Sequence, residues 1–366
     1  MKILFIGDYS NLHTTLAGEL RRMGHQADVM SDGCGHMNLS ADFYIKREAG
    51  LLGGGKYLYQ LFEILPKLKG YDVVQLINTN FLSLKPQKIK YFFDRIKEQN
   101  GSMFLSLAGN DYYYCKACYD GKILRFSDFK IGNEFTPGHQ EKPNHLFGWL
   151  SYHNKILAEH IYSEINGAMA VLPEYELATK HILGDKVFFT NLPIDLSEIP
   201  EVKTKQDEKI KLYLGIRSWG EIFKGSRILK NIALEIEKDM PDKVEVEIVK
   251  DLPFKEYLSR MAQSDIVLDQ LYAYSPAMTA LYGMSLGKVV ATGAQPEYYD
   301  YIGNPTERPI LALSPFDKDI KERLINLVLN PDELKLRGQQ GRKIVVENND
   351  SKIVANKFLE HWNNKA

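Results

Sequence analysis

A strand–loop–helix–strand pattern between Asp265 and Glu297 constrains the fold of this chain more than any other segment. Its residues are DIVLDQLYAYSPAMTALYGMSLGKVVATGAQPE. Apolar runs predict strands over Ile266–Leu271 and Val289–Thr292, which a short polar loop and a small-residue helix connect. Strands connected through a helix pair in parallel, as in α/β proteins. The free amides and positive end of that helix would lie at the top of the sheet, where a phosphate can bind.

The length and composition indicate a globular protein of two domains. At 366 residues the chain suits two domains of about 150–200 residues each. The composition, 44% hydrophobic and 25% charged, is ordinary, and the net charge of −1 gives no electrostatic reason to expect nucleic-acid binding. No apolar stretch approaches the roughly 20 residues of a membrane-spanning helix, and the start MKILFIGDYS predicts a first strand rather than a signal peptide. We therefore expect a cytoplasmic protein.

Strand and helix patterns alternate over two stretches of the chain, separated by a charged segment. The first alternation opens with the strand Lys2–Gly7, and the second begins at Ile210. The residues EIPEVKTKQDEK at 198–209 are charged, contain a proline and have few apolar side chains, which is typical of a domain boundary. We therefore predict two doubly wound, Rossmann-like α/β domains, over residues 1–196 and 205–348, facing each other across a cleft.

Two cations precede this pattern in the second predicted domain. Arg217 directly follows the strand 210–216, and Lys224 lies seven residues later at the start of a helix. Arginine offers a bidentate fork and lysine a mobile point charge, the combination that a diphosphate needs. Two surface cations near loops are the alternative, but the phosphate-binding pattern in the same domain favours the diphosphate.

The residues Met284–Thr292, MSLGKVVAT, resemble the "EAMAxGxPVVAT" motif of GT-B glycosyltransferases, especially those of family 4. In that family an arginine after a strand and a following Lys-Gly precede the motif in the same order. The resemblance is specific over about residues 210–300 and only architectural over the first domain. It implies the GT-B fold, with an acceptor-binding domain at 1–196, a donor-binding domain at 205–348, and a C-terminal helix, 351–366, packed back on the first domain.

The resemblance also implies the activity. It suggests a retaining, metal-independent transferase that moves a sugar from a nucleotide-diphosphate-sugar to a glycan or lipid-linked acceptor, as in bacterial surface polysaccharide synthesis. No cofactor or metal is expected, because cations and helix amides would stabilise the leaving diphosphate, which accepts the proton of the acceptor. The residues predicted to hold the diphosphate are Arg217, Lys224, Ala277, Met278 and Thr279.

The chain departs from the family at two glutamates that orient the donor sugar and hold the ribose. Tyr274 and Tyr282 occupy those positions, and with Ser275 they are the predicted sugar and ribose contacts. A buried crossover helix with Tyr282 in the core is an equally good interpretation. The loss of both carboxylates keeps two alternatives open: a GT-B nucleotide-sugar epimerase or hydrolase, and a catalytically silent GT-B protein that binds a sugar nucleotide or glycan.

Loops at strand ends of the first domain supply the predicted acceptor side. Asp111, in the run LAGND, matches the place of a Gly-Ser-Asp-like tripeptide in the family, and it could hold an acceptor hydroxyl or the donor sugar. A helix-capping role is as good an explanation. The other predicted acceptor-side residues are Asp8, His13 and Asn110. Packing is the more common role of a histidine at a helix start, such as His13.

Three weaker signals remain. Cys115 and Cys118 form a lone CxxC, which favours neither a zinc site nor a disulfide framework. The run Gly53–Lys56 lacks Walker spacing and predicts a flexible loop. The helix Gln87–Gln99 is basic and could contact an anionic membrane surface that carries a lipid-linked acceptor, although a solvated face is the preferred interpretation.

Overall fold

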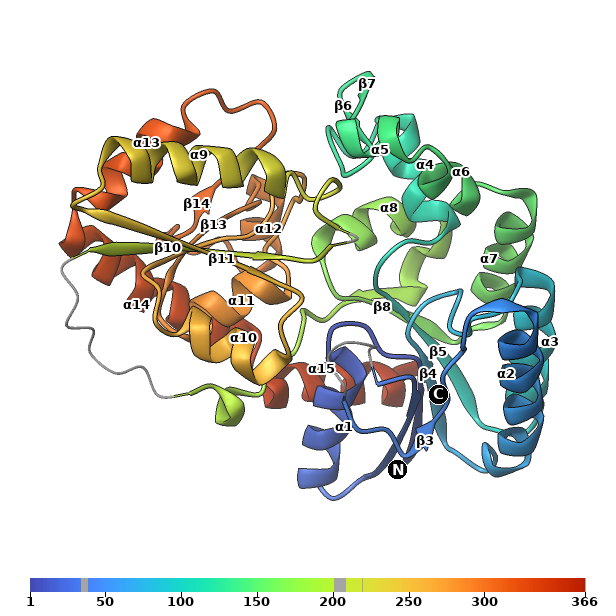
Figure 1. The fold of residues 1–366 in the computed structure, drawn as a ribbon. Helices are drawn as coiled ribbons and strands as arrows, with labels where there is room; N and C mark the ends of the chain where they lie inside the picture. Colours follow the sequence, from blue (N-terminus) through green and yellow to red (C-terminus); the bar gives the residue numbers. More distant parts are fainter. Residues whose placement is uncertain (34–38, 201–208, 219, 366) are drawn as a thin grey trace. The chain divides into compact units, whose positions relative to one another are not determined.

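The computed structural model describes residues 1–33, 39–200, 209–218 and 220–365 (Figure 1). Most of the predicted boundary segment 198–209 lies outside these residues. The chain divides into two compact units, and residues 118–145, which the predicted first domain included, group with the second unit. The first unit comprises Met1–Ala117, Leu146–Pro193 and Ser351–Ala366, and the second comprises Cys118–His145 and Ile194–Asp350.

The first unit is built on a seven-stranded sheet in which every neighbouring pair is parallel. Its central strands are buried along almost their whole length, as expected for strands with helices on both faces. The strand order reverses between β1 and β4, which makes the sheet doubly wound. In spatial order the strands are β3 (Phe43–Tyr44), β2 (Gln26–Ser31), β1 (Lys2–Ile6), β4 (Val73–Leu76), β5 (Ser102–Leu107), β8 (Gly167–Ala170) and β9 (Val187–Phe189).

The last helix of the chain completes the core of the first unit. Val354, Phe358 and Trp362 recur every four residues and share one face, which packs toward α1 and β8. The indole Nε1 of Trp362 donates to Oε1 of Gln75 at 3.0 Å, inside the sheet. The long helices of this unit are α1 (Leu12–Arg22), α2 (Gly50–Ile64), α3 (Pro86–Glu98), α7 (Tyr152–Glu164), α8 (Pro173–Leu183) and α15 (Ser351–Lys365).

The prediction of a flexible loop at Gly53–Lys56 is wrong, because these residues lie in the first turns of α2. Each glycine costs a helix about 1 kcal/mol relative to alanine. Packing explains one of them: a Cβ on Gly53 would lie 2.4 Å from the carbonyl oxygen of Glu48. The close approach of the chain at Glu48, five residues earlier, therefore requires glycine despite its low helix propensity.

The second unit carries a five-stranded parallel sheet, whose order reverses between β10 and β12. Figure 1 shows α9 and α13 on one face of this sheet and α10, α11 and α14 on the other. The strands, in spatial order, are β11 (Val244–Lys250), β10 (Ile210–Ile216), β12 (Ile266–Leu268), β13 (Val289–Thr292) and β14 (Leu311–Ala312). The helices are α9 (Ser226–Asp239), α10 (Phe254–Met261), α11 (Met278–Ser285), α12 (Pro296–Tyr301), α13 (Ile320–Val328) and α14 (Pro331–Asn348).

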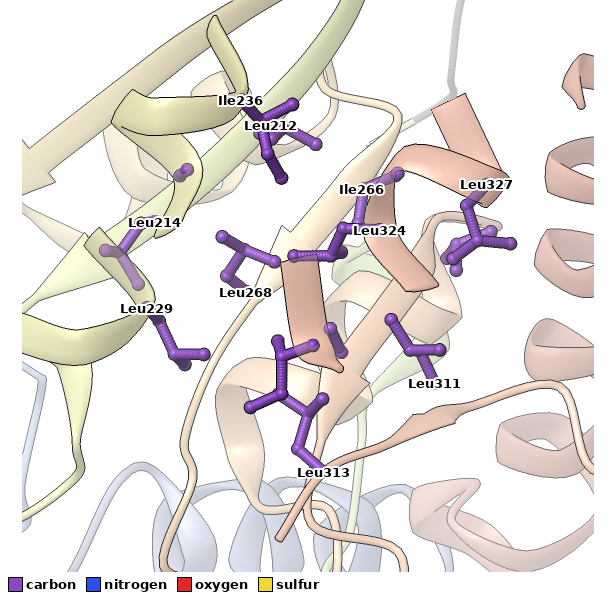
Figure 2. Packing of buried hydrophobic residues seen from close by; sticks show 14 of the residues in the cluster. Leu212, Leu214, Leu229, Ile236, Ile266, Leu268, Leu311, Leu313, Leu324 and Leu327 are labelled. Atoms are coloured by element: carbon purple, nitrogen blue, oxygen red, sulfur yellow. The ribbon is translucent and has the colours of Figure 1, made fainter. Parts of the chain in front are cut away.

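Alternating strand residues form the core between this sheet and α9 and α13. Leu212 and Leu214 of β10 point to the same side as Leu268 of β12, since strand side chains alternate between faces. They meet Leu229 of α9 and Leu324 of α13, as Figure 2 shows. This packing fixes the register of β10 and β12, and with it the positions of the loops that follow them.

Residues 118–145 form short elements. These are the end of α4 (Tyr112–Asp120), the antiparallel hairpin of β6 (Lys130–Ile131) and β7 (Glu134–Phe135), α5 (Pro137–Glu141), and the start of α6 (Asn144–Trp149). Thr136 caps α5 by accepting from the His139 amide. In the described part of the chain, no helix is both long and apolar enough to cross a bilayer.

Candidate functional site

The reversal of strand order between β10 and β12 brings two loops together at one edge of the second sheet. Arg217 follows β10, and Lys224 ends the loop that leads to α9. Leu271, in the loop after β12, donates its amide to the Lys224 carbonyl at 2.8 Å. Gly225 has a φ of +70°, and a Cβ there would lie 2.7 Å from Cβ of Leu271, so glycine permits the approach. In open α/β sheets, ligands bind at such a reversal point.

A buried carboxylate that the sequence analysis did not single out lies beside Lys224. Asp269 directly follows β12 and is only 3% exposed. Its Oδ1 is 3.7 Å from Nζ of Lys224, and its Oδ2 accepts from Oγ1 of Thr292 at 3.3 Å. A carboxylate at the end of an apolar strand was a signal that could have been noticed. The charge of Lys224 is therefore partly offset within the protein.

Arg217 differs from Lys224, because its half-buried guanidinium has no ion pair among the described residues. It lies close enough to Tyr257 of α10 to influence that phenol electrostatically. Burial raises the pKa of Tyr257 above its usual range, and Asp269 adds to the shift while Thr279 and Arg217 oppose it. The Tyr257 hydroxyl donates to Oγ1 of Thr279 at 3.2 Å. Nothing in the sequence pattern predicted these interactions of Tyr257 with Thr279 and Arg217.

The start of α11 lies at the same edge and has no side-chain cap. Ala277 is the N-cap residue, with extended backbone, and Met278 and Thr279 begin the helix. The first amides of a helix lack intrahelical acceptors and carry the positive end of the helix dipole. An uncapped start next to Arg217 is therefore suited to bind an anion.

Tyr274 is engaged by the segment 118–145. It is buried, and its hydroxyl accepts from the Arg125 amide. Its ring stacks on Phe126, with centroids 4.7 Å apart, and the Arg125 guanidinium carbon lies 5.1 Å from its centroid. Arg125 also forms a bidentate pair with Glu297, at 2.6 and 3.1 Å. Tyr274 therefore anchors this segment.

The pKa values in this cluster follow from the same contacts. The hydrogen bond to Glu297 raises the pKa of Arg125. Burial alone would raise the pKa of Glu297, but hydrogen bonds from Arg125 and from the backbone bring it below its usual value. Burial raises the pKa of Tyr274, so its hydroxyl stays protonated. The pair is thus fully charged near neutral pH.

Tyr282 and Ser275 lie in the interior of the second unit. Tyr282 is buried on α11, with its ring 5.1 Å from that of Phe254 in an edge-on arrangement. This is the core position that the sequence left open as an alternative. Ser275 is fully buried in the loop before α11.

Asp8 and His13 form a closed polar cluster at the end of β1. Asp8 accepts from the amides of His13 and Thr14 at 3.0 Å and from the Thr14 hydroxyl at 2.6 Å. His13 has no exposed area, and its ring nitrogens lie 2.6 Å from the Gly7 carbonyl and 3.0 Å from Oγ of Ser106. Burial lowers the pKa of His13 to about 3, so the ring is neutral. Both side chains support the start of α1.

Asp111 is also buried, and both of its carboxylate oxygens accept hydrogen bonds. It accepts from the Tyr114 amide at 2.7 Å and from the Tyr162 hydroxyl at 2.5 Å, and burial raises its pKa. Asn110 beside it is half-buried. Asp111 borders a small cavity at the ends of β4 and β5, which is too small to admit a water molecule. The polar residues that line it are Asn78, Thr79, Ser106, Asp111, Tyr114, Tyr175 and Thr179.

No group of three His, Cys, Asp or Glu side chains in the described residues is arranged to hold a metal. Cys115 and Cys118 are buried on α4.

The sequence matches no family model and no curated protein. Solved structures nevertheless resemble it over the whole chain. Sucrose-phosphate synthase from Thermosynechococcus elongatus has a TM-score of 0.63 at 12% identity, covering 100% of this chain and 99% of its own. Anabaena HepE in complex with UDP and glucose has a TM-score of 0.62 at 12% identity, covering 98% of both chains. UDP-GlcNAc 2-epimerase from Neisseria meningitidis, bound to UDP-GlcNAc, has a TM-score of 0.56 at 15% identity, covering 98% and 100%.

At these identities the likeness concerns the fold. The predicted α/β fold class is confirmed: each unit has a doubly wound parallel sheet, and the chain shares the GT-B fold of these glycosyltransferases. The same fold also serves the epimerase.

Proposed function

We propose that the protein is a glycosyltransferase that binds a nucleoside-diphosphate sugar at the β10/β12 edge of the second unit. The observation that carries the proposal is that Arg217 and the uncapped start of α11 both neighbour the Tyr257 hydroxyl, which bonds to Thr279 and is influenced by the Arg217 charge. A diphosphate needs positive charge and amide donors together, and this edge supplies both.

In this proposal Arg217 and the α11 amides hold the diphosphate before and during sugar transfer. Negative charge grows on the leaving diphosphate as the glycosidic bond breaks, and preorganised donors stabilise that charge without a metal. Lys224 exchanges its contact with Asp269 for the diphosphate. The acceptor hydroxyl attacks from the face that the diphosphate leaves, with retention of configuration, and the leaving phosphate takes its proton.

The acceptor in this proposal is a glycan or a lipid-linked sugar of a bacterial surface polysaccharide. Asp111 and Asn110, which follow β5 of the first unit, are the acceptor-side candidates. Because HepE was solved with UDP, with UDP-glucose, and with UDP and glucose, uridine diphosphate sugars are the first donors to test.

A second function, nucleotide-sugar epimerisation or hydrolysis, is favoured by the position of Tyr274. Its hydroxyl already accepts from the Arg125 amide, so it cannot accept two hydrogen bonds from a sugar as a carboxylate would. An enzyme that binds the diphosphate tightly and the sugar weakly would transfer the sugar to water or epimerise it. A silent binding protein would share the same diphosphate site.

The test is incubation of the protein with a panel of radiolabelled nucleotide sugars, with and without glycan acceptors. We expect labelled acceptor, or slow donor hydrolysis, and loss of both in Arg217→Ala but not in the exposed control Arg308→Ala. Conversion of a donor into its epimer would instead establish the epimerase. Donor binding without turnover would indicate a silent protein, and absence of both across the panel would refute a nucleotide-sugar function.

A further inference from the structure

Helix α2 of the first unit is apolar on both of its faces. Tyr57 and Leu61 face the interior and are buried. On the outside, Leu51 and Leu52 are 96% and 92% exposed. Lys56, Gln60 and Glu63 form a polar stripe between these two faces. The outer leucines are nevertheless in contact with solvent, where large apolar side chains are not normally gathered.

The exposed apolar residues lie on one side of α2. At 100° per residue, Leu51, Leu52, Tyr59 and Phe62 fall within one third of the helix circumference. Phe62 extends this surface to α3, because its ring lies 6.3 Å from that of the exposed Tyr91. We refer to these five side chains, Leu51, Leu52, Tyr59, Phe62 and Tyr91, as the α2 face.

The exposure of the α2 face is not a consequence of a loosely packed helix. Gly53 packs against the carbonyl of Glu48, and Tyr57 accepts from the Ser83 amide at 3.2 Å. Both contacts hold the buried side of α2 in place. Leu51 and Leu52 are thus presented outward by an anchored helix, and exposed apolar surface of this kind marks interaction sites.

The part of the chain that contains the α2 face carries an excess of positive charge. Residues 46–98 contain ten Lys and Arg but five Asp and Glu, in a chain of net charge −1. On α3, Lys90 and Lys97 are paired with Asp94 and Glu164. The basic residues of this region that are exposed and form no ion pair among the described residues are Lys46, Arg47, Lys67, Lys69, Lys85 and Lys88.

We propose that the α2 face docks on an anionic membrane surface. The leucines would enter the layer between headgroup and acyl chains, and the flanking lysines would contact lipid phosphates. A second copy of the chain is a poorer partner, because a two-fold contact would set this positive charge against itself. The proposal concerns α2 and does not depend on the nucleotide-sugar chemistry.

The test is co-sedimentation of the full chain with vesicles of phosphatidylcholine alone or mixed with phosphatidylglycerol. Binding is expected to the mixed vesicles and to fall with salt, because headgroup attraction is screened. The double variant Leu51→Asp, Leu52→Asp should bind about tenfold more weakly or worse. Both side chains are almost fully exposed, so its thermal unfolding should match that of the wild type.

The matched control is Leu336→Asp, which changes an exposed leucine on α14 of the second unit and should bind like the wild type. Lys85→Ser with Lys88→Ser should weaken binding to mixed vesicles only. Failure of the wild type to sediment, or equal binding by the leucine variant, would overturn the proposal. So would a dimer in solution that the leucine variant abolishes, since the α2 face would then contact a second copy.

Discussion

The strand-order reversals of the two sheets present opposite chemistry. At the end of β1, Asp8 and His13 are buried and hydrogen-bonded to their own surroundings. At the end of β10, Arg217 has no ion pair among the described residues and lies near an uncapped helix. The same topology thus supports a closed polar cluster in one unit and an open cationic site in the other. The difference shows that topology offers a site, while side chains decide whether it is open to a ligand.

The largest expected effect is a loss of nucleoside-diphosphate affinity when Arg217, at the β10/β12 edge, is substituted. Arg217→Ala should weaken binding of a nucleoside diphosphate by about 100-fold, or about 2.7 kcal/mol, because a charged bidentate donor is lost. Isothermal titration calorimetry with UDP measures the change, and Arg308→Ala is the control. Unchanged affinity would place the diphosphate elsewhere.

In the closed cluster of Asp8 and His13, a substitution should change the free energy of unfolding rather than ligand affinity. The pKa of His13 is lowered to about 3 in the folded state, so the unfolded chain binds the additional proton below its own pKa of about 6.5. This contribution to stability is complete above pH 6.5 and declines as the pH falls toward 3. By pH 4.5 the loss of stability amounts to about 2–3 kcal/mol. Denaturant unfolding at pH 7 and pH 4.5 should show a smaller difference for His13→Gln than for the wild type.

Substitution of Tyr274 distinguishes a structural role of this side chain from a role in ligand binding. Tyr274→Phe removes the acceptor of the Arg125 amide and should lower the free energy of unfolding by about 1 kcal/mol. Affinity for UDP should stay unchanged, and so should affinity for a UDP-sugar. A selective loss of affinity for the UDP-sugar would mean that the hydroxyl contacts the sugar after all.

The smallest effect is expected at Asp269. Asp269→Asn keeps the shape of the side chain but removes the charge that faces Lys224 at 3.7 Å. We expect UDP to bind about threefold more tightly, because less of the lysine charge is offset. Weaker binding would instead show that Asp269 orients Lys224 for the ligand.

Sequence periodicity predicted the elements around the open edge well. The strand over 210–216 and the position of Arg217 follow from local patterns, since alternation and helix starts are short-range signals. Contacts between distant residues could not be predicted in this way. Arg125 and Glu297 are 172 residues apart in the chain, and nothing near either one indicates the other. The assignment of residues 118–145 to the second unit depends on such contacts.

The position of α15 has a consequence for biosynthesis. Trp362 and Phe358 fill the centre of the first unit, yet they follow the whole of Ile194–Asp350 in the chain. During translation the second unit therefore has all of its residues before the first unit has its last helix. Until then the apolar side chains that α15 covers, such as Phe5 and Phe104, have no complete cover. The nascent first unit is thus the part of the protein most in need of a chaperone.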